Sequence, residues 1–534
     1  MKGSGWRLVA AFIALLILVP LLVVLASVFS PEQEIWQHLL EYVLPGLLGN
    51  TLRLVLGVGI GVIVLGVSLA WLTAVCEFPG RRFFAWALLL PLALPAYVTA
   101  FVYIALLDYT GPLQTGLREI FGSSLAFPSI RSAGGVIIVM SLSLYPYVYL
   151  LARNAFLTQG KRALEAAQTL GYSRRAGFFK VALPLARPWI MAGLMLALME
   201  TLADFGTVAV FNYDTFTTAI YKTWFGMFSL QGASQLASVL ILLAFALITA
   251  EQFSRRGARF NQAGRHTRME RIVLRGYHAC LASGFAALVL LIAFVIPVGQ
   301  LLLWAKNIFA QDFDVRYLEF LGHSLLLGAL AAALVVAAAL LLTYAQRQHN
   351  DAWTRTMVRI ATLGYAVPGA VLAVGIVIPL AWMDKQLIFA LNNWLGIESG
   401  LILQGTLLVM LPAYLTRFLA VGYNPLESAM HRVTRNLEEA ARSLGQSGIA
   451  VLRSVHLPML RGGLLTAAAL VFVDVMKEMP ITLMTRPFGW DTLAVRIFEM
   501  TSEGEWERAA LPAIALVLAG LLPIALLIKH SEKS

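Results

Sequence analysis

The sequence predicts an all-α polytopic membrane protein of about twelve transmembrane helices, arranged as two parallel six-helix repeats. Three observations lead to this prediction. The 534 residues are 59% hydrophobic and only 13% charged, with a mean hydropathy of +0.77, whereas a soluble chain carries about 25% charged residues. Apolar runs long enough to cross a bilayer recur along the whole chain. One segment pattern also occurs twice, 274 residues apart.

About twelve apolar runs approach the roughly 20 helical residues that cross a hydrocarbon core about 30 Å thick. They lie at about 8–29, 50–75, 83–107, 133–155, 188–210, 234–252, 279–304, 323–345, 360–382, 400–423, 462–484 and 508–529. The first run is longer than the h-region of a signal peptide, which has about 7–15 residues, and no small-x-small cleavage site closes it. We therefore expect it to be retained as the first span.

Lysine and arginine residues set the expected orientation. Loops on one predicted side of the membrane are basic. Those on the other side lack Lys and Arg, as around Glu32, Glu34 and Glu41, or are acidic on balance, as over 486–507. The positive-inside rule places the basic loops in the cytoplasm, and both chain termini with them. The same rule accounts for the net charge of +11 without a nucleic-acid partner.

The sequence argues against an enzyme. The two cysteines, Cys76 and Cys280, are far apart, so neither a disulfide framework nor a thiolate metal site is expected. No nucleophile–base set and no cluster of metal ligands appears. The phosphate-binding pattern G-x-x-x-x-G-K-[ST] is also missing, so this chain does not hydrolyse ATP by that route. Energy for any transport must come from a separate ATPase or from an ion gradient.

An internal repeat divides the chain. Residues 164–171 read LEAAQTLG and residues 438–445 read EEAARSLG, and a Leu-Pro pair follows each at the same distance. We expect a first transmembrane repeat over 1–252, a cytoplasmic linker over 253–278 and a second repeat over 279–534. Parallel repeats of this kind pack around a pseudo-twofold axis along the membrane normal, with the transport pathway between them.

The repeated segment is predicted to be a short helix–turn–helix on the cytoplasmic side. Residues 161–170 are good helix formers, and Gly171 suits a helix C-cap. Ala166 and Ala167 are small and allow another surface to approach closely. A generic amphipathic loop is the alternative, but the pattern occurs twice with identical internal spacing. Two copies of the loop would dock two copies of a partner.

These segments resemble the EAA loops of ABC-type importer permeases, which dock on ATP-binding subunits. The resemblance is greatest to the fused, two-half permeases of ferric-iron importers. Three further segments support it: YAVPGAVLAVGIVIP at 365–379, ETLADFGTVAVFNYDTFTTAIY at 200–221 and DVMKEMPITLMTRPFGWDTLAVRIFE at 474–499. The resemblance implies ATPase-coupling residues at Glu165, Ala166, Ala167, Gly171, Glu439, Ala440, Ala441 and Gly445.

The resemblance also implies partners and a location. A permease of this family sits in the bacterial cytoplasmic (inner) membrane among lipids. It binds two copies of an ABC ATPase on the cytoplasmic side and receives Fe(III) from an extracytoplasmic ferric-binding protein. It binds no cofactor itself, because ATP is used by the partner subunit.

Four acidic residues lie at expected membrane depth, where ionisable groups are costly and are functional candidates by default. They are Glu200, Asp204, Asp474 and Glu478. The repeat pairs the first with the third and the second with the fourth, and a spacing of four places each pair on one helical face. Fe(III) is a hard cation that prefers oxygen ligands, so these carboxylates are candidates for the substrate pathway, although no metal site is assigned. Pairing with Lys477 or Arg486 is the alternative.

Other residues near these acids are weaker candidates. Tyr213 and Asp214, loosely matched by Trp490 and Asp491, could extend the pathway towards the outer face. Four prolines interrupt spans at corresponding depths, and we expect them to kink helices. They are Pro95, Pro146, Pro368 and Pro412.

Two other readings remain open. A fused ABC permease for thiamine or another small solute would share the loops and the repeat. A secondary transporter driven by an ion gradient could use the intramembrane carboxylates as proton or sodium sites. The duplicated EAA loop discriminates against the second reading, because a gradient-driven carrier needs no docking loop for an ATPase.

Overall fold

The computed structural model describes residues 4–30, 32–122, 128–160, 167–169, 171–255, 271–396, 400–446 and 449–531. In these ranges the chain is helical apart from loops and two two-residue strands. Ten helices are long and apolar enough to span a membrane, or eleven if a pair bent by 76°, Ile449–Met459 with Arg461–Lys477, counts as one span. The all-helical membrane architecture is confirmed, with fewer unbroken spans than the twelve predicted.

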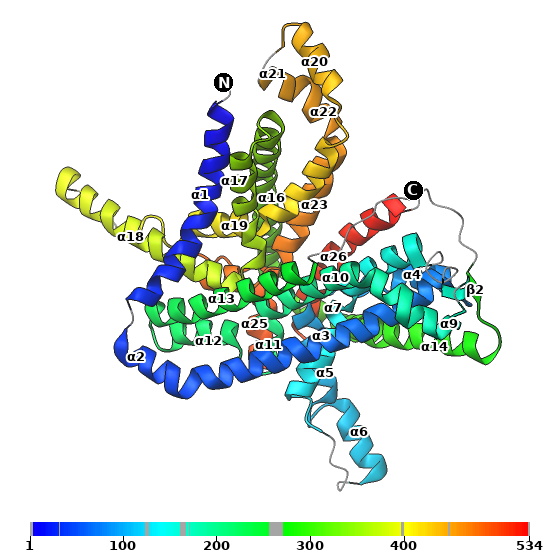
Figure 1. Cartoon of the computed structure of the whole chain (residues 1–534). Helices are drawn as coiled ribbons and strands as arrows, with labels where there is room; N and C mark the ends of the chain where they lie inside the picture. The colour runs from blue at the N-terminus through cyan, green and yellow to red at the C-terminus, as the bar shows by residue number, and fades with distance from the viewer. Residues whose placement is uncertain are drawn as a thin grey trace.

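Figure 1 shows the helices in chain order. Those of the first half are α1 (Ser4–Ala26), α2 (Gln33–His38), α3 (Leu44–Val75), α4 (Arg81–Ala87), α5 (Ala96–Leu107), α6 (Pro112–Phe121), α7 (Ala133–Ala155), α9 (Arg174–Gly177), α10 (Leu183–Ala203), α11 (Gly206–Val210), α12 (Phe216–Tyr221) and α13 (Leu230–Arg255). Those of the second half up to the predicted coupling loop are α14 (Tyr277–Leu290), α15 (Ile296–Asp312), α16 (Val315–Gln348), α17 (Ala352–Ala361), α18 (Gly369–Leu395) and α19 (Leu407–Met430).

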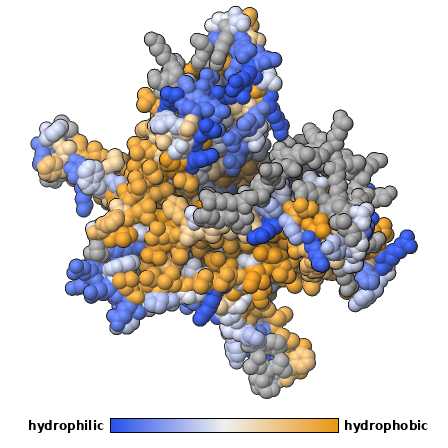
Figure 2. All heavy atoms as spheres, in the orientation of Figure 1, coloured by the Kyte–Doolittle hydropathy of each residue, from blue (hydrophilic) through white to orange (hydrophobic). Residues whose placement is uncertain are grey.

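The remaining helices are α20 (Arg435–Ser443), α21 (Ile449–Val451), α22 (Leu457–Met459), α23 (Arg461–Lys477), α24 (Pro480–Thr485), α25 (Leu493–Ser502) and α26 (Ala510–Ser531). Strand β1 (Cys76–Glu77) pairs in parallel with β2 (Ile272–Val273). This short pairing fastens the end of the predicted linker to the first half of the chain. Figure 2 shows a mostly hydrophobic body, with hydrophilic residues gathered at the upper extremity, where α20 to α22 lie.

Two predicted spans, 83–107 and 360–382, are broken at equivalent prolines. Pro95 precedes α5 and Pro368 precedes α18, with nearly the same backbone angles (φ −58° and ψ 140°, φ −58° and ψ 144°). The prediction that these two prolines kink helices is therefore wrong. Each instead stands just before a helix, where its missing N–H costs no intrahelical hydrogen bond. Pro146 and Pro412 do lie inside helices, α7 and α19.

Two more predicted spans, 188–210 and 462–484, are broken at equivalent acids. Helix α10 ends at Asp204 (φ −65°, ψ 131°) and α23 ends at Glu478 (φ −72°, ψ 123°). A short helix follows each break, α11 in the first half and α24 in the second. Irregular backbone at membrane depth is tolerated where it is buried in protein or lines a cavity. These breaks thus mark a place where the chain departs from simple spans.

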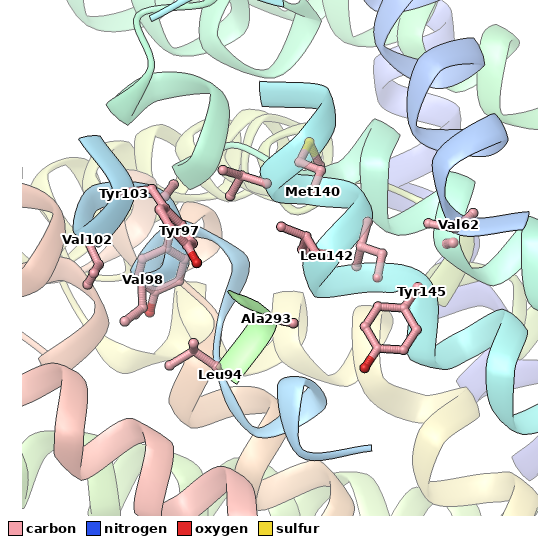
Figure 3. Packing of buried hydrophobic residues seen from close by; sticks show 14 of the residues in the cluster. Val62, Leu94, Tyr97, Val98, Val102, Tyr103, Met140, Leu142, Tyr145 and Ala293 are labelled. Carbon is pink, nitrogen blue, oxygen red and sulfur yellow. The ribbon is translucent and has the colours of Figure 1, made fainter. Parts of the chain in front are cut away.

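The hydrophobic cores combine both halves of the chain. One core joins residues of α3, α5 and α7 to Ala293 and to residues of α15 and α26. The other joins residues of α16, α18 and α19 to residues of α1 and α13. Figure 3 shows Ala293 among labelled side chains of residues 94–103 and of α7. The first helices of the two halves are therefore exchanged, each packing on the opposite half.

Specific contacts hold the exchanged helices. The ring of Trp6 in α1 meets Tyr344 in α16 edge-on, with centroids 4.7 Å apart. In the other direction, the Tyr103 hydroxyl of α5 donates to the carbonyl of Ile292 at 2.5 Å. Arg7 forms an ion pair with Asp351, the residue that caps α17. Hydrogen bonding to the Thr354 N–H, together with Arg7, lowers the pKa of Asp351 below its ordinary value.

The helices of the first half pack closely at glycines, and Gly193 gives a test of that packing. A Cβ there would lie 2.7 Å from Val148 Cα and 2.8 Å from the Tyr147 carbonyl oxygen, both backbone atoms of α7. We expect Gly193→Ala to destabilise the protein by about 1–3 kcal/mol through overpacking. Gly284→Ala is the matched control, because its Cβ would meet nothing within 4 Å.

The control should be neutral or stabilising by up to about 1 kcal/mol, since alanine favours a helix over glycine. Midpoints of thermal unfolding of the purified chains measure both effects. Equal midpoints for the two variants would contradict the close α7–α10 packing.

Candidate functional site

A cavity of about 220 Å³ lies between the two halves. All four predicted pathway acids line it: Glu200, Asp204, Asp474 and Glu478. Three of the four helix breaks also line it, at Pro95, Asp204 and Glu478. The fourth lies beside it, because a Cβ on Gly369 would come within 2.6 Å of Glu478 Oε1. The structure thus gathers the interrupted ends of equivalent helices, with their acids, into one place.

Two of the acids cap the short helices that follow the breaks. Asp204 accepts hydrogen bonds from the Thr207 hydroxyl at 2.8 Å and the Val208 N–H at 3.2 Å. Glu478 accepts from the Ile481 N–H at 3.0 Å, and the Thr482 N–H lies 3.4 Å away. The exposed N–H groups at a helix start favour a negative partner. Both carboxylates therefore have a structural task in addition to any contact with substrate.

The other two acids have few partners. Glu200 accepts a hydrogen bond from the Tyr365 hydroxyl at 3.0 Å, a contact that joins the first half to the second. Asp474 has no hydrogen-bond donor within reach among the described residues. Both face the cavity from the last turns of α10 and α23. These two carboxylates are the ones whose oxygen atoms remain available to a ligand.

Two cations line the same cavity, Arg417 and Lys477. Arg417 donates from Nη1 to the Val367 carbonyl at 2.9 Å, and Lys477 donates to the Leu92 carbonyl at 3.0 Å. Neither lies within the 4.0 Å of an ion pair from any of the four acids in the described structure. Arg486 is engaged elsewhere, with Asp491 and Glu499. The expected alternative, direct pairing of the cavity acids with Lys477 or Arg486, is therefore wrong.

The cations break the symmetry of the repeat. At the offset of 274 residues, Arg417 corresponds to Ser143 and Lys477 to Ala203, and both of these counterparts line the cavity too. The carboxylates are contributed equally by the two halves, whereas both cations come from the second. Sequence reasoning missed Arg417, although a charged residue inside the apolar run 400–423 is a signal that it could have used.

The residues proposed to extend the pathway lie outside the cavity lining. Asp214 pairs with Lys222 at 2.5 Å, and the Tyr213 hydroxyl donates to the Asn50 carbonyl at 3.2 Å. Trp490 stacks on His323 with ring centroids 4.3 Å apart. Among the described residues, no group of three or more His, Cys, Asp or Glu side chains is placed to hold a metal ion. The cavity acids are thus spread around the space and do not form a closed metal cage.

The second predicted coupling loop lies on and after α20. Glu439 and Ala440 are exposed, and Ala441 is buried. Gly445 ends the helix with φ +80°, and the Gln446 N–H donates back to the Ala441 carbonyl at 3.0 Å. This bond and the left-handed glycine are typical of a Schellman C-cap.

The first predicted loop is described only in part. Glu165 and Ala166 lie outside the described residues. Ala167 is buried, and Gly171 has φ +80°. The Tyr172 N–H donates to the Ala167 carbonyl at 2.9 Å, as in the second loop. The two loops therefore end in the same turn, at equivalent glycines.

An ion pair fastens α20 to the membrane helices of the second half. Glu438, buried beside the exposed Glu439, accepts from Arg347 Nε at 2.7 Å. Arg347 also donates to the Val433 carbonyl at 2.8 Å, and His456 Nε2 lies 3.6 Å from Glu438. His456 precedes α22 and α23, and α23 carries Asp474 and Lys477 to the cavity. A continuous physical link thus runs from α20 to the candidate site.

Comparison with known proteins adds the family. Residues 62–250 and 336–533 match the model of the family described as binding-protein-dependent transport system inner membrane component. The chain is 30% identical over 494 residues to the Fe(3+)-transport system permease protein FbpB 2 of Haemophilus influenzae, covering 91% of this chain and 90% of the relative.

Two further relatives show the range of the family. The ferric transport system permease protein FbpB of Actinobacillus pleuropneumoniae is 22% identical, over 90% of this chain and 70% of its own length. The molybdenum transport system permease protein ModB of Escherichia coli is 29% identical over 184 residues, which are 34% of this chain and 79% of the relative. Similarity over the whole chain is thus seen with ferric permeases, and similarity over one half with a molybdenum permease.

Proposed function

Because the chain belongs to the family of binding-protein-dependent transport system inner membrane components, we propose that it is the permease through which an ABC importer moves Fe(III) into the cell. As a member of that family it is a non-catalytic, multi-pass subunit of the inner membrane. It works with an ATPase and an extracytoplasmic binding protein, and it needs no cofactor of its own. Fe(III) as the cargo is the finer statement that requires a test.

The cavity between the halves is the observation that carries this proposal. Four carboxylates and the hydroxyl of Tyr365 surround a closed space at the interrupted ends of membrane helices. Fe(III) is a hard cation that favours carboxylate and phenolate oxygen. Glu200 and Asp474 are the acids with oxygen atoms to offer, and they come from different halves. Similarity over nearly the full chain to two ferric permeases points to the same cargo.

The coupling loops give the proposed direction of energy flow. Two ATPase copies would bind on the cytoplasmic side, one at the first loop, with Glu165 and Gly171, and one at α20, with Glu439 and Gly445. Both chain termini would lie on that side. Motion of α20 would reach the cavity through Arg347 and α23. The two repeats, 1–252 and 279–534, would then rock around the cavity between inward and outward access.

Purified chain, ATPase and binding protein in sealed vesicles test the proposal. We expect radiolabelled iron to enter only when ATP is available to the ATPase and the ferric-loaded binding protein is on the opposite face. Labelled thiamine and molybdate serve as competing cargoes in parallel vesicles. An imposed proton or sodium gradient without ATP tests the secondary-transport alternative.

The outcomes separate the candidates. Uptake of thiamine or molybdate without uptake of iron would assign a different cargo to the same ABC mechanism. Uptake driven by the gradient alone, with ATP depleted, would reject the ABC mechanism itself.

A further inference from the structure

We propose that Arg417 and Lys477 form an oxyanion subsite within the carboxylate cavity, so that iron crosses together with a bound oxyanion such as phosphate, carbonate or a small carboxylate. This inference rests on the proposed function, because it concerns the form in which Fe(III) occupies the same cavity. It depends on four features of the site: the unmet donors of Arg417, the position of Lys477, the distance of both from the acids, and their absence from the first half.

Arg417 is the first feature. Its side chain is 9% exposed, and it lines the cavity from α19. One nitrogen donates to the Val367 carbonyl, while Nε is buried and has no hydrogen-bond partner in the described structure. A guanidinium carries five donors in a planar fork that suits oxyanions. Buried polar groups are nearly always satisfied, so the unpaired donor indicates that a ligand completes the site.

Lys477 is the second feature. It lies at the end of α23 and lines the cavity beside the break at Glu478. Its ammonium has three donors, and the one hydrogen bond assigned to it among the described residues goes to the Leu92 carbonyl of the other half. A second cationic donor therefore serves the same space as Arg417 but from a different helix.

The third feature is the separation of the charges. Buried cations and carboxylates normally pair directly, because an isolated buried charge is costly. In this cavity neither cation comes within 4.0 Å of Glu200, Asp204, Asp474 or Glu478. The opposite charges are held apart around open space. A ligand that carries both signs, a metal cation bound to an oxyanion, would contact the acids and the cations together.

The fourth feature is the asymmetry of the repeat. The equivalent positions in the first half hold Ser143 and Ala203, which also line the cavity. Helices of the same arrangement therefore pack there without a cation, so packing alone does not require Arg417 and Lys477. With every group ionised, the first half offers two negative charges and the second half offers two of each sign. A bare trivalent cation would be repelled by the second half, whereas an iron–oxyanion complex is matched by both.

Double-label uptake tests this inference with the complete complex of chain, ATPase and ferric-loaded binding protein in vesicles. Radiolabelled iron is supplied with labelled phosphate, labelled bicarbonate or labelled citrate, one at a time. We expect one of these oxyanions to enter with iron in a fixed ratio, dependent on ATP and on iron. Arg417→Gln and Lys477→Gln should each raise the oxyanion concentration needed for half-maximal iron uptake by about tenfold or more, the effect of losing a charged hydrogen bond.

Arg508→Gln is the control, because Arg508 pairs with Asp312 and Glu505 at the surface. It should leave the oxyanion dependence unchanged. Arg417→Lys keeps the charge and should retain part of the affinity, whereas a purely structural role would change the maximal rate and leave the oxyanion dependence as it is. The co-uptake measurement needs no variant, so it decides the question even if a variant fails to fold.

Iron uptake by the unaltered complex without any of the three oxyanions would overturn the inference and leave the proposed function intact. Unchanged oxyanion dependence in both Arg417→Gln and Lys477→Gln would also overturn it. Failure of iron to enter at all would instead reject the proposed function.

Discussion

Glu200→Gln and Asp474→Asn are each expected to lower ATP-driven iron uptake by about tenfold to a hundredfold while the amount of protein in the membrane stays the same. Loss of a charged contact is worth about 1.5–3 kcal/mol, and these acids have few other contacts to lose. Glu200 accepts one hydrogen bond, from Tyr365, and Asp474 accepts none in the described structure. Initial rates of labelled iron uptake in vesicles, normalised to protein content, provide the measurement.

The capping acids supply a matched comparison. Asp204→Asn and Glu478→Gln keep an oxygen that can accept the N–H groups of α11 and α24, so their uptake should fall much less. Asp204→Ala and Glu478→Ala remove the acceptor and should destabilise the protein by about 1 kcal/mol each, the usual cost of losing a helix cap. Wild-type uptake by both Glu200→Gln and Asp474→Asn would contradict the assignment of these two acids to the pathway. An equal loss in all four amide variants would contradict the division into two roles.

Changing Gly171 and Gly445 together to alanine is expected to uncouple the permease from its ATPase. Both glycines have φ +80°, where a Cβ costs about 1–2 kcal/mol per residue. The Schellman turns that end the coupling helices would be strained in both halves. We expect iron uptake and co-purification of the ATPase to fall by about tenfold or more, with normal membrane insertion, because neither Cβ would meet an atom within 4 Å.

Gly462→Ala is the control for this pair. Its Cβ also meets nothing within 4 Å, but its backbone is helical with negative φ, so a loss specific to the left-handed glycines can be separated from a general effect of alanine. Undiminished ATPase binding and uptake in the double variant would show that the two turns do not form the docking surface.

The sequence alone was sufficient for the features that depend on local chemistry. Hydropathy predicted a helical membrane protein, because lipid requires every backbone polar group to be satisfied within the segment. The repeat at 274 residues placed Glu200 opposite Asp474 and Asp204 opposite Glu478, and these four acids do line one cavity. The helix-ending role of Gly171 also followed from residue type, because glycine adopts positive φ without penalty.

Continuity of the helices could not be read from hydropathy. An apolar run shows that a segment can be buried, but it does not show whether the backbone remains helical throughout. The runs 83–107, 188–210, 360–382 and 462–484 are all interrupted, at Pro95, Asp204, Pro368 and Glu478. Once buried in protein rather than lipid, such a break can satisfy its N–H groups with a nearby carboxylate, as Asp204 and Glu478 do.

Tertiary packing decided the rest. The exchange of α1 and α15 between halves carries no local signal, because an apolar helix face fits either partner and only the complete set of contacts selects one. The placement of Arg417 and Lys477 in the acidic cavity, without ion pairs to its acids, likewise depends on how α19 and α23 cross the first half. The sequence therefore determined which groups are present and how they repeat, and the long-range packing of helices determined which of them share a space.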